Sequence, residues 1–220
     1  MGPMANPPPD PPPERPAATF LPMCWLAFLC GAIVVALADV LPWRLTFVRP
    51  DNLLACFTEV QLFFAFFAWP LFIPSLAARG EARPLLREAG TLVLLGLPPA
   101  LACANVSNAG AAGFLRAQAL VAAAAALVAA IHALGLRRGW RVGPWYILGA
   151  FLVSAGLPYL AFLLYEFGGE GDLPWIAALS PFWAGSRVDG AGSLLHAAAW
   201  AALAGGLFAA ARIPRRGEAP

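Results

Sequence analysis

Long uninterrupted blocks of apolar residues constrain this chain more than any other feature of its sequence. A helix needs about 20 apolar residues to cross the ~30 Å hydrocarbon core of a bilayer, and six blocks are long enough. Their approximate bounds are 19–41, 53–77, 92–113, 115–136, 145–166 and 192–212. The blocks lack the periodicity of helices or strands with one solvated face. We therefore predict an all-α fold, a polytopic membrane protein built as a bundle of six transmembrane helices.

Composition indicates that lipid rather than water surrounds these blocks. Of the 220 residues, 60% are hydrophobic and 12% are charged, which is about half the charged share of a typical soluble domain. We predict one transmembrane domain over 17–212, between tails at 1–16 and 213–220. The first tail has eight prolines, which favours a disordered or polyproline-II segment.

The distribution of arginine predicts the orientation. All 14 basic residues are arginine, and with both tails inside, the cytoplasmic side carries ten of them and the opposite side four. Short cytoplasmic loops are enriched in basic residues, so we expect both termini in the cytoplasm (N-in/C-in). Abundant Ala, Gly, Pro and Arg without Lys indicates a high-GC genome, and we expect a multi-pass protein of a bacterial inner membrane. The sequence has no basic patch of the kind that would indicate a nucleic-acid partner.

Two stretches leave the path of the chain open. The third and fourth blocks are separated only by Phe114–Arg116, which predicts a tight helical hairpin. If 92–113 lay on the surface, five spans would remain and the orientation would have to be reconsidered. In the long external loop 167–191, the segment Leu173–Trp183 is apolar enough to lie along the membrane surface or to re-enter it.

Polar residues within the spans are the first candidates for function, because burying them in lipid is costly. Glu59 lies about two turns inside the second span, and His196 about one turn inside the sixth. Asn105 and Asn108 fall in the outer half of the third. Together they predict an outward-facing polar cavity. The alternative is that each side chain reaches the headgroups or pairs with a neighbour.

The sequence offers little support for an enzyme, a metal site or a cofactor. Phosphate-loop, zinc-protease and serine-hydrolase motifs are absent. The four cysteines form no C-x-x-C pair, so we expect buried thiols and no metal. His132 and His196 could ligate haem only if they lay at one depth. Their places in the spans predict heights that differ by roughly 15–20 Å, so no shared haem is expected.

The connection between the second and third spans carries a family resemblance. It reads Arg79-Gly-Glu-Ala-Arg-Pro-Leu-Leu-Arg-Glu-Ala-Gly-Thr-Leu-Val-Leu-Leu-Gly-Leu-Pro-Pro99. This resembles the loop of ABC-2-type transporter permeases, in which a charged Arg/Glu stretch leads into G-T-L-x-x-L-x-x-x-P. Near the other end, Leu179-Ser180-Pro181-Phe182 is similar to an L-x-P-F segment of the same family. Val93 stands where the family commonly has an acidic residue.

The resemblance implies a permease subunit of an ABC-type export system. Loop 79–92 would then contact a separate ATP-binding subunit, which would hydrolyse the ATP, and the chain would work as a homodimer or with a second permease subunit. The coupling residues implied by the resemblance are Arg83, Arg87, Glu88, Gly90, Thr91 and Leu92. Two other functions remain open: a non-transporting accessory or assembly subunit of a membrane complex, and a redox subunit that binds haem or quinone through His132 or His196.

Overall fold

The computed structural model of this chain describes residues 23–31, 50–73, 82–168, 176, 178–187 and 190–212. Regular structure in these residues is helical, without a strand, and the all-α prediction is confirmed. The α-helices are α2 (Leu53–Phe63), α4 (Ala82–Val106), α5 (Gly110–Arg138), α6 (Val142–Phe151), α7 (Leu157–Gly168), α9 (Pro181–Ser186) and α10 (Ala191–Arg212). Shorter elements are the 3-10 helices η1 (Pro50–Asn52) and η3 (Trp69–Leu71) and the π-helical turns η2 (Phe64–Ala68) and η4 (Leu152–Gly156).

Five helical stretches in the described residues are long and apolar enough to cross a membrane. They are Leu53–Leu71, Pro84–Val106, Gly110–Arg138, Val142–Phe167 and Gly192–Arg212. Each corresponds to one of the last five predicted spans, and this pattern fits an integral membrane protein. Most of the predicted first span, 19–41, lies outside the described residues, as do both tails. Its described part, 23–31, is helical, and Trp25 donates its indole N–H to the carbonyl of Leu92 at 2.9 Å.

The turn between the third and fourth spans lies earlier than the expected hairpin at Phe114–Arg116. Helix α4 ends at Val106, and Asn108 and Gly110 have positive φ values of 54° and 67°. Asparagine and glycine tolerate this left-handed conformation, and the amide of Ala109 bonds the carbonyl of Ala104 at 3.1 Å. Small apolar residues on both sides of the turn extended the hydropathy of the block and concealed it.

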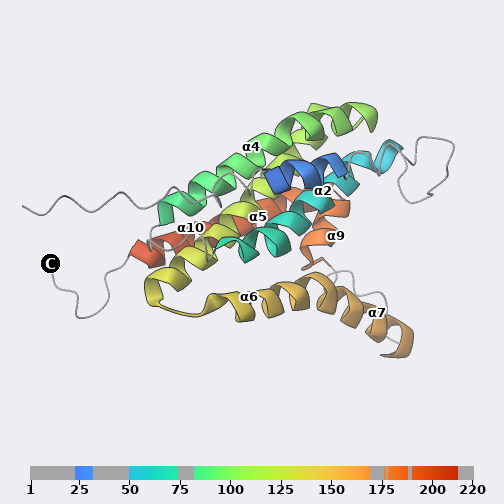
Figure 1. Ribbon diagram of the computed structural model, residues 1–220. Coiled ribbons are helices and arrows are strands. Elements are labelled where there is room, and N and C mark those ends of the chain that lie inside the picture. The colour runs from blue at the N-terminus through green and yellow to red at the C-terminus, as the bar shows by residue number, and fades with distance from the viewer. Residues whose placement is uncertain are drawn as a thin grey trace, which may run out of the picture.

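Helix α5 is the centre of the bundle. In its most apolar window 67% of the residues are buried, against 6% in the Val142–Phe167 stretch. Alanines on several sides of α5, among them Ala117, Ala124 and Ala130, are completely buried, and small side chains allow membrane helices to approach closely. Figure 1 shows α4, α2 and α10 around α5, with α6 and α7 set apart along one side.

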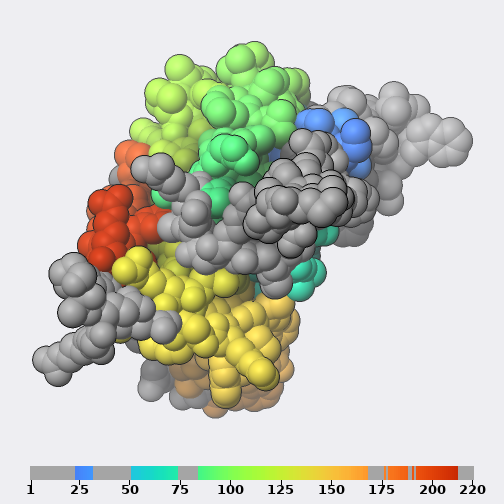
Figure 2. Space-filling view, turned by 60° about the vertical axis from the view of Figure 1, so that its left-hand side comes forward, coloured from blue at the N-terminus to red at the C-terminus, as the bar shows by residue number. Residues whose placement is uncertain are grey.

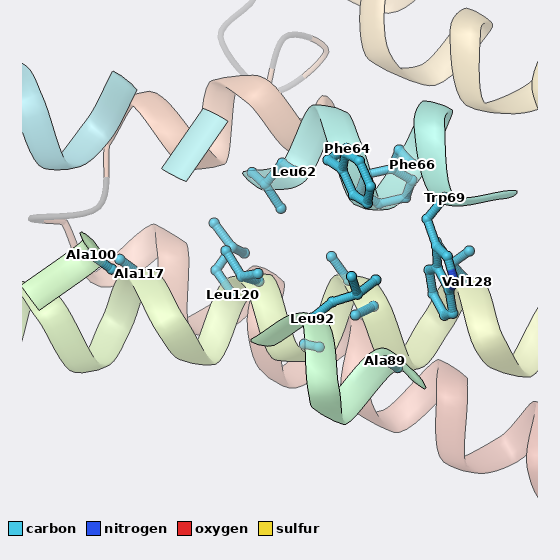
Figure 3. Close-up of a cluster of buried hydrophobic side chains, with 14 of the residues drawn as sticks. Leu62, Phe64, Phe66, Trp69, Ala89, Leu92, Ala100, Ala117, Leu120 and Val128 are labelled. Carbon is cyan, nitrogen blue, oxygen red and sulfur yellow. The ribbon is translucent and has the colours of Figure 1, made fainter. Parts of the chain in front are cut away.

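Aromatic side chains of the second span belong to the main cluster of buried apolar residues. Trp69 lies beside Val128 of α5 in Figure 3, whereas the ring of Phe64 lies 4.2 Å from that of Trp25 and the ring of Phe66 lies 5.7 Å from that of Trp200 in α10. Trp69 is completely buried. Because lipid is as apolar as these rings, close packing rather than a hydrophobic driving force holds this cluster together.

The helices are arranged so that arginines gather at one end of the bundle. Helices α5 and α10 finish at the end where α4 and α6 begin (Figure 1). That end, here called the arginine-rich end, carries Arg87, Arg137, Arg138, Arg141 and Arg212. Of the described residues, Arg116 and Arg187 belong to the other half. The charge asymmetry read from the sequence is therefore a spatial asymmetry of the folded helices.

Candidate functional site

The segment that resembles a coupling loop forms the first turns of a membrane helix. Helix α4 runs from Ala82 to Val106 without a break, so residues 82–92 and the third span are one rod. Leu85, Ala89 and Leu92 are buried at 1%, 5% and 5% exposure, and their spacing is that of one helical face. The segment is amphipathic, but it is not a separate surface helix. Residues 79–81 and the side chain of Arg83 lie outside the described part.

A hydrogen bond ties this segment to the second span. The indole N–H of Trp69, in η3, donates to Oε2 of Glu88 at 3.4 Å. Glu88 is half-buried, while Arg87 and Gly90 are exposed beside it. The hydroxyl of Thr91 donates to the carbonyl of Arg87 at 2.9 Å, so this hydroxyl is bonded within its own helix. Of the six residues implied by the resemblance, Glu88 and Leu92 therefore face the bundle and Arg87 and Gly90 face outward.

The four residues expected to form one polar cavity fall into two groups. Asn105 and Asn108 are exposed at the α4–α5 turn. Glu59 and His196 instead border the connection between α7 and α10. A Cβ atom on Gly185 would lie 3.2 Å from Cγ of Glu59, and Nε2 of His196 bonds the carbonyl of Ala178. No hydrogen bond within the described residues joins either asparagine to Glu59 or His196.

The connection between α7 and α10 turns back into the bundle. Ser180 is completely buried, and its hydroxyl donates to the carbonyl of Ser154 at 2.9 Å. Ser154 stands in the middle of the Val142–Phe167 stretch, so Ser180 reaches the middle of that helix. The short helix α9 follows and packs on α2, as Figure 1 shows. The described part of this loop therefore packs against the helices, and whether it lies along the membrane surface or re-enters it stays a prediction.

Two carbonyl groups that stand four residues before a proline accept hydrogen bonds from side chains of other elements. Pro158 has no N–H for the carbonyl of Ser154, four residues earlier, and Ser180 supplies the missing donor. Pro70 stands in the same relation to Phe66, whose carbonyl accepts the hydroxyl of Tyr146 at 3.0 Å. Both carbonyls lie in π-helical turns. In a membrane helix such freed carbonyls are satisfied by neighbouring helices, and here they are.

A pair of buried amides was not anticipated. Nε2 of Gln118 in α5 donates to Oε1 of Gln61 in α2 at 3.2 Å. Among the described residues, Nε2 of Gln61 and Oε1 of Gln118 have no hydrogen-bond partner. Gly96 of α4 faces the pair, and a Cβ atom there would stand 2.2 Å from Nε2 of Gln61. Both amides stand in the sequence as polar but non-ionisable residues within apolar blocks.

The two histidines have separate surroundings. Nδ1 of His132 bonds the carbonyl of Val128 at 3.0 Å, and its ring lies 4.7 Å from that of Tyr146. His196 contacts Trp200, at a ring distance of 6.0 Å. Since Leu127 and Ala130 of α5 pack on Ala204 of α10, His132 lies well beyond the level of His196 along the bundle. The described residues contain no group of three His, Cys, Asp or Glu side chains that could hold a metal ion.

Comparison with known proteins identifies no relative of this chain. No family model, curated protein or solved structure matches the chain. Any assignment of function therefore depends on the residues themselves: the start of α4 with its bond to Trp69, the packing of α9 on α2, and the charge asymmetry of the two ends.

Proposed function

We propose that this chain is the membrane-spanning permease subunit of an ABC-type export system, and that the start of α4 is where a separate ATPase subunit binds. The observation that carries the proposal is the Trp69–Glu88 hydrogen bond. It joins the segment that resembles a coupling loop to the end of the second span, so a force applied there reaches two spans. The exposed side chains of Leu86 and Arg87 on the same turns are accessible to a partner.

The continuity of α4 supports this proposal mechanically. A helix of 25 residues is about 37 Å long at 1.5 Å per residue. Movement of its first turns would therefore pass directly into the third span as far as Pro98 and Pro99, where the hydrogen-bond ladder is interrupted and the helix can bend between inward-open and outward-open states. In this proposal the arginine-rich end and both termini lie in the cytoplasm, the membrane is a bacterial inner membrane, and the chain works as a homodimer or beside a second permease.

Co-isolation with an ATPase tests the proposal. Tagged chain purified from its native membrane should carry a protein with a phosphate-loop motif, and the Arg87→Ala variant should retain at most about a tenth of it, because loss of a charged interface contact typically costs 1.5–3 kcal/mol. Arg138→Ala is the matched control, since that arginine is exposed at the same end but on α5. Absence of an ATPase from the wild-type preparation would overturn the proposal.

A second candidate function is that of a non-transporting accessory subunit. The closely packed interior favours it, because Gly96 leaves no room beside Gln61 and Gln118 for a polar path between α2, α4 and α5. Isolation within a membrane complex that lacks a nucleotide-binding protein would support this alternative and exclude the first.

A further inference from the structure

A pocket at the arginine-rich end is lined by apolar side chains, by two tryptophans and by an arginine. It lies where α5, α6 and α10 meet and has a volume of about 590 Å³. Apolar side chains of α5 and α10 line its inner part, and the α5–α6 turn with the first residues of α6 forms its mouth. The lining includes Ile131, Leu134, Trp140, Arg141, Trp145 and Leu207. Figure 2 views this end, with the turn and α6 in yellow below the red end of α10.

The mouth of the pocket is suited to an anion. Arg141 is exposed there and makes no ion pair with a described residue. It is also the N-cap of α6, which begins without a side-chain cap. The amide of Gly143 stands at the second position of α6, where no carbonyl within the helix can accept it. A guanidinium and a helix N-terminus both favour phosphate oxygens, and here Arg141 and Val142, the N-cap and first residue of α6, both line the pocket.

The depth of the pocket is suited to an acyl chain. Ile131 and Leu134 are one turn apart on α5, and Leu207 faces them from α10. Trp140 and Trp145 are 62% and 76% exposed at the rim, and such amphipathic rings concentrate at the level of lipid headgroups. A free phosphate ion would use the arginine but leave the apolar part of the pocket unfilled.

We propose that this pocket binds one anionic phospholipid, with its phosphate at Arg141 and an acyl chain along Ile131, Leu134 and Leu207. The site is independent of the ATPase proposal, since it lies on α5, α6 and α10 and uses no residue of α4. An anionic lipid there would fill the space between α6 and α10 at the point where the weakly packed Val142–Phe167 helix leaves the bundle.

Native mass spectrometry of the purified chain in detergent tests this assignment, with phosphatidylglycerol and phosphatidylcholine as probes. We expect one phosphatidylglycerol to bind about tenfold more tightly than phosphatidylcholine, because its headgroup brings a net negative charge to Arg141, whereas the quaternary ammonium of phosphatidylcholine offsets the charge of its phosphate. Arg141→Gln should abolish the preference. Arg187→Gln is the control, since Arg187 stacks on Trp183 in the other half of the molecule, 4.3 Å from the ring centroid. Equal retention of the two lipids, or equal effects of the two substitutions, would refute the proposal.

A second pair of variants separates lipid from free phosphate. Leu207→Trp fills the apolar part and should remove the bound lipid, whereas Leu203→Trp, one turn away on the lipid-exposed surface of α10, should not. Millimolar inorganic phosphate should fail to displace phosphatidylglycerol. If phosphate competes effectively and Leu207→Trp has no effect, the site holds an ion and the phospholipid assignment is wrong.

Discussion

Gln61 and Gln118 show how a single polar contact can be built into an apolar interior. Both are buried, at 0% and 6% exposure, and they join α2 to α5. Interhelical hydrogen bonds in membranes contribute about 0.6 kcal/mol on average, so the bond between them is a modest stabiliser. The bond nevertheless requires a glycine at position 96, because a side chain there would collide with the amide of Gln61.

Gly96→Ala should therefore destabilise the protein by about 1–3 kcal/mol, the range typical of overpacking. The new Cβ atom would collide with Nε2 of Gln61 at 2.2 Å and force that side chain away from Gln118. The midpoint of thermal unfolding in a fixed detergent measures the effect.

Gly90→Ala is the matched control on the same helix, because nothing lies within 4 Å of the position where its Cβ would be. Alanine is a better helix former than glycine by about 1 kcal/mol, so this change should be neutral or stabilising. In a Gln61→Ala background the cost of Gly96→Ala should largely disappear. A cost that persists there would show that Gly96 is required for some reason other than Gln61.

At the scale of elements, the prolines in the spans explain which side chains reach across the bundle. Pro70 and Pro158 each free a carbonyl in a π-helical turn, and Tyr146 and Ser180 donate to these carbonyls. The second of these bonds holds the connection between α7 and α10 at the middle of the Val142–Phe167 helix. The position of α9 therefore depends on a proline in another helix.

Ser180→Ala should destabilise the protein by about 1 kcal/mol, since it leaves the carbonyl of Ser154 without its donor. In a Pro158→Ala background the restored backbone N–H can bond that carbonyl, and Ser180→Ala should cost less. The two substitutions and their combination form a double-mutant cycle whose interaction term is read from thermal unfolding midpoints. Strictly additive effects would contradict this account of Ser180.

The sequence predicted the elements well where hydropathy alone decides them, as for the spans that begin near Leu53 and Gly192. It misplaced the α4–α5 turn, because that turn depends on the left-handed conformations of Asn108 and Gly110 rather than on a loss of hydropathy. It also placed Glu59 and Asn105 in one polar cavity, whereas they lie in separate groups. A shared depth in the membrane does not specify which helices are neighbours. The bonds of Ser180 and Tyr146 required knowledge of tertiary packing.

At the scale of the whole molecule, the segregation of arginine predicts how the bundle sits in the membrane. Arg138 marks the arginine-rich end, and the α4–α5 turn marks the other. Since basic residues are retained on the cytoplasmic side, the two ends should differ in their access to reagents added outside the cell.

Single cysteines in a background without the four native ones test this orientation. A membrane-impermeant maleimide should label Ala111→Cys, exposed in the first turn of α5, in intact cells. Arg138→Cys, at the last residue of the same helix, should be labelled only after the membrane is opened. The reverse pattern would invert the orientation and place the start of α4 outside the cell.

The most direct test of the proposed function is site-specific photo-crosslinking in native membranes from two positions on α4. A photo-reactive residue at Leu86, exposed on the first turns, should form an adduct with a phosphate-loop ATPase. The same residue at Leu94, exposed eight positions further into the span, should not. Adducts to an ATPase from position 86 alone are the predicted result. No ATPase adduct from position 86, or equal adducts from both positions, would contradict the assignment of α4 as the coupling element.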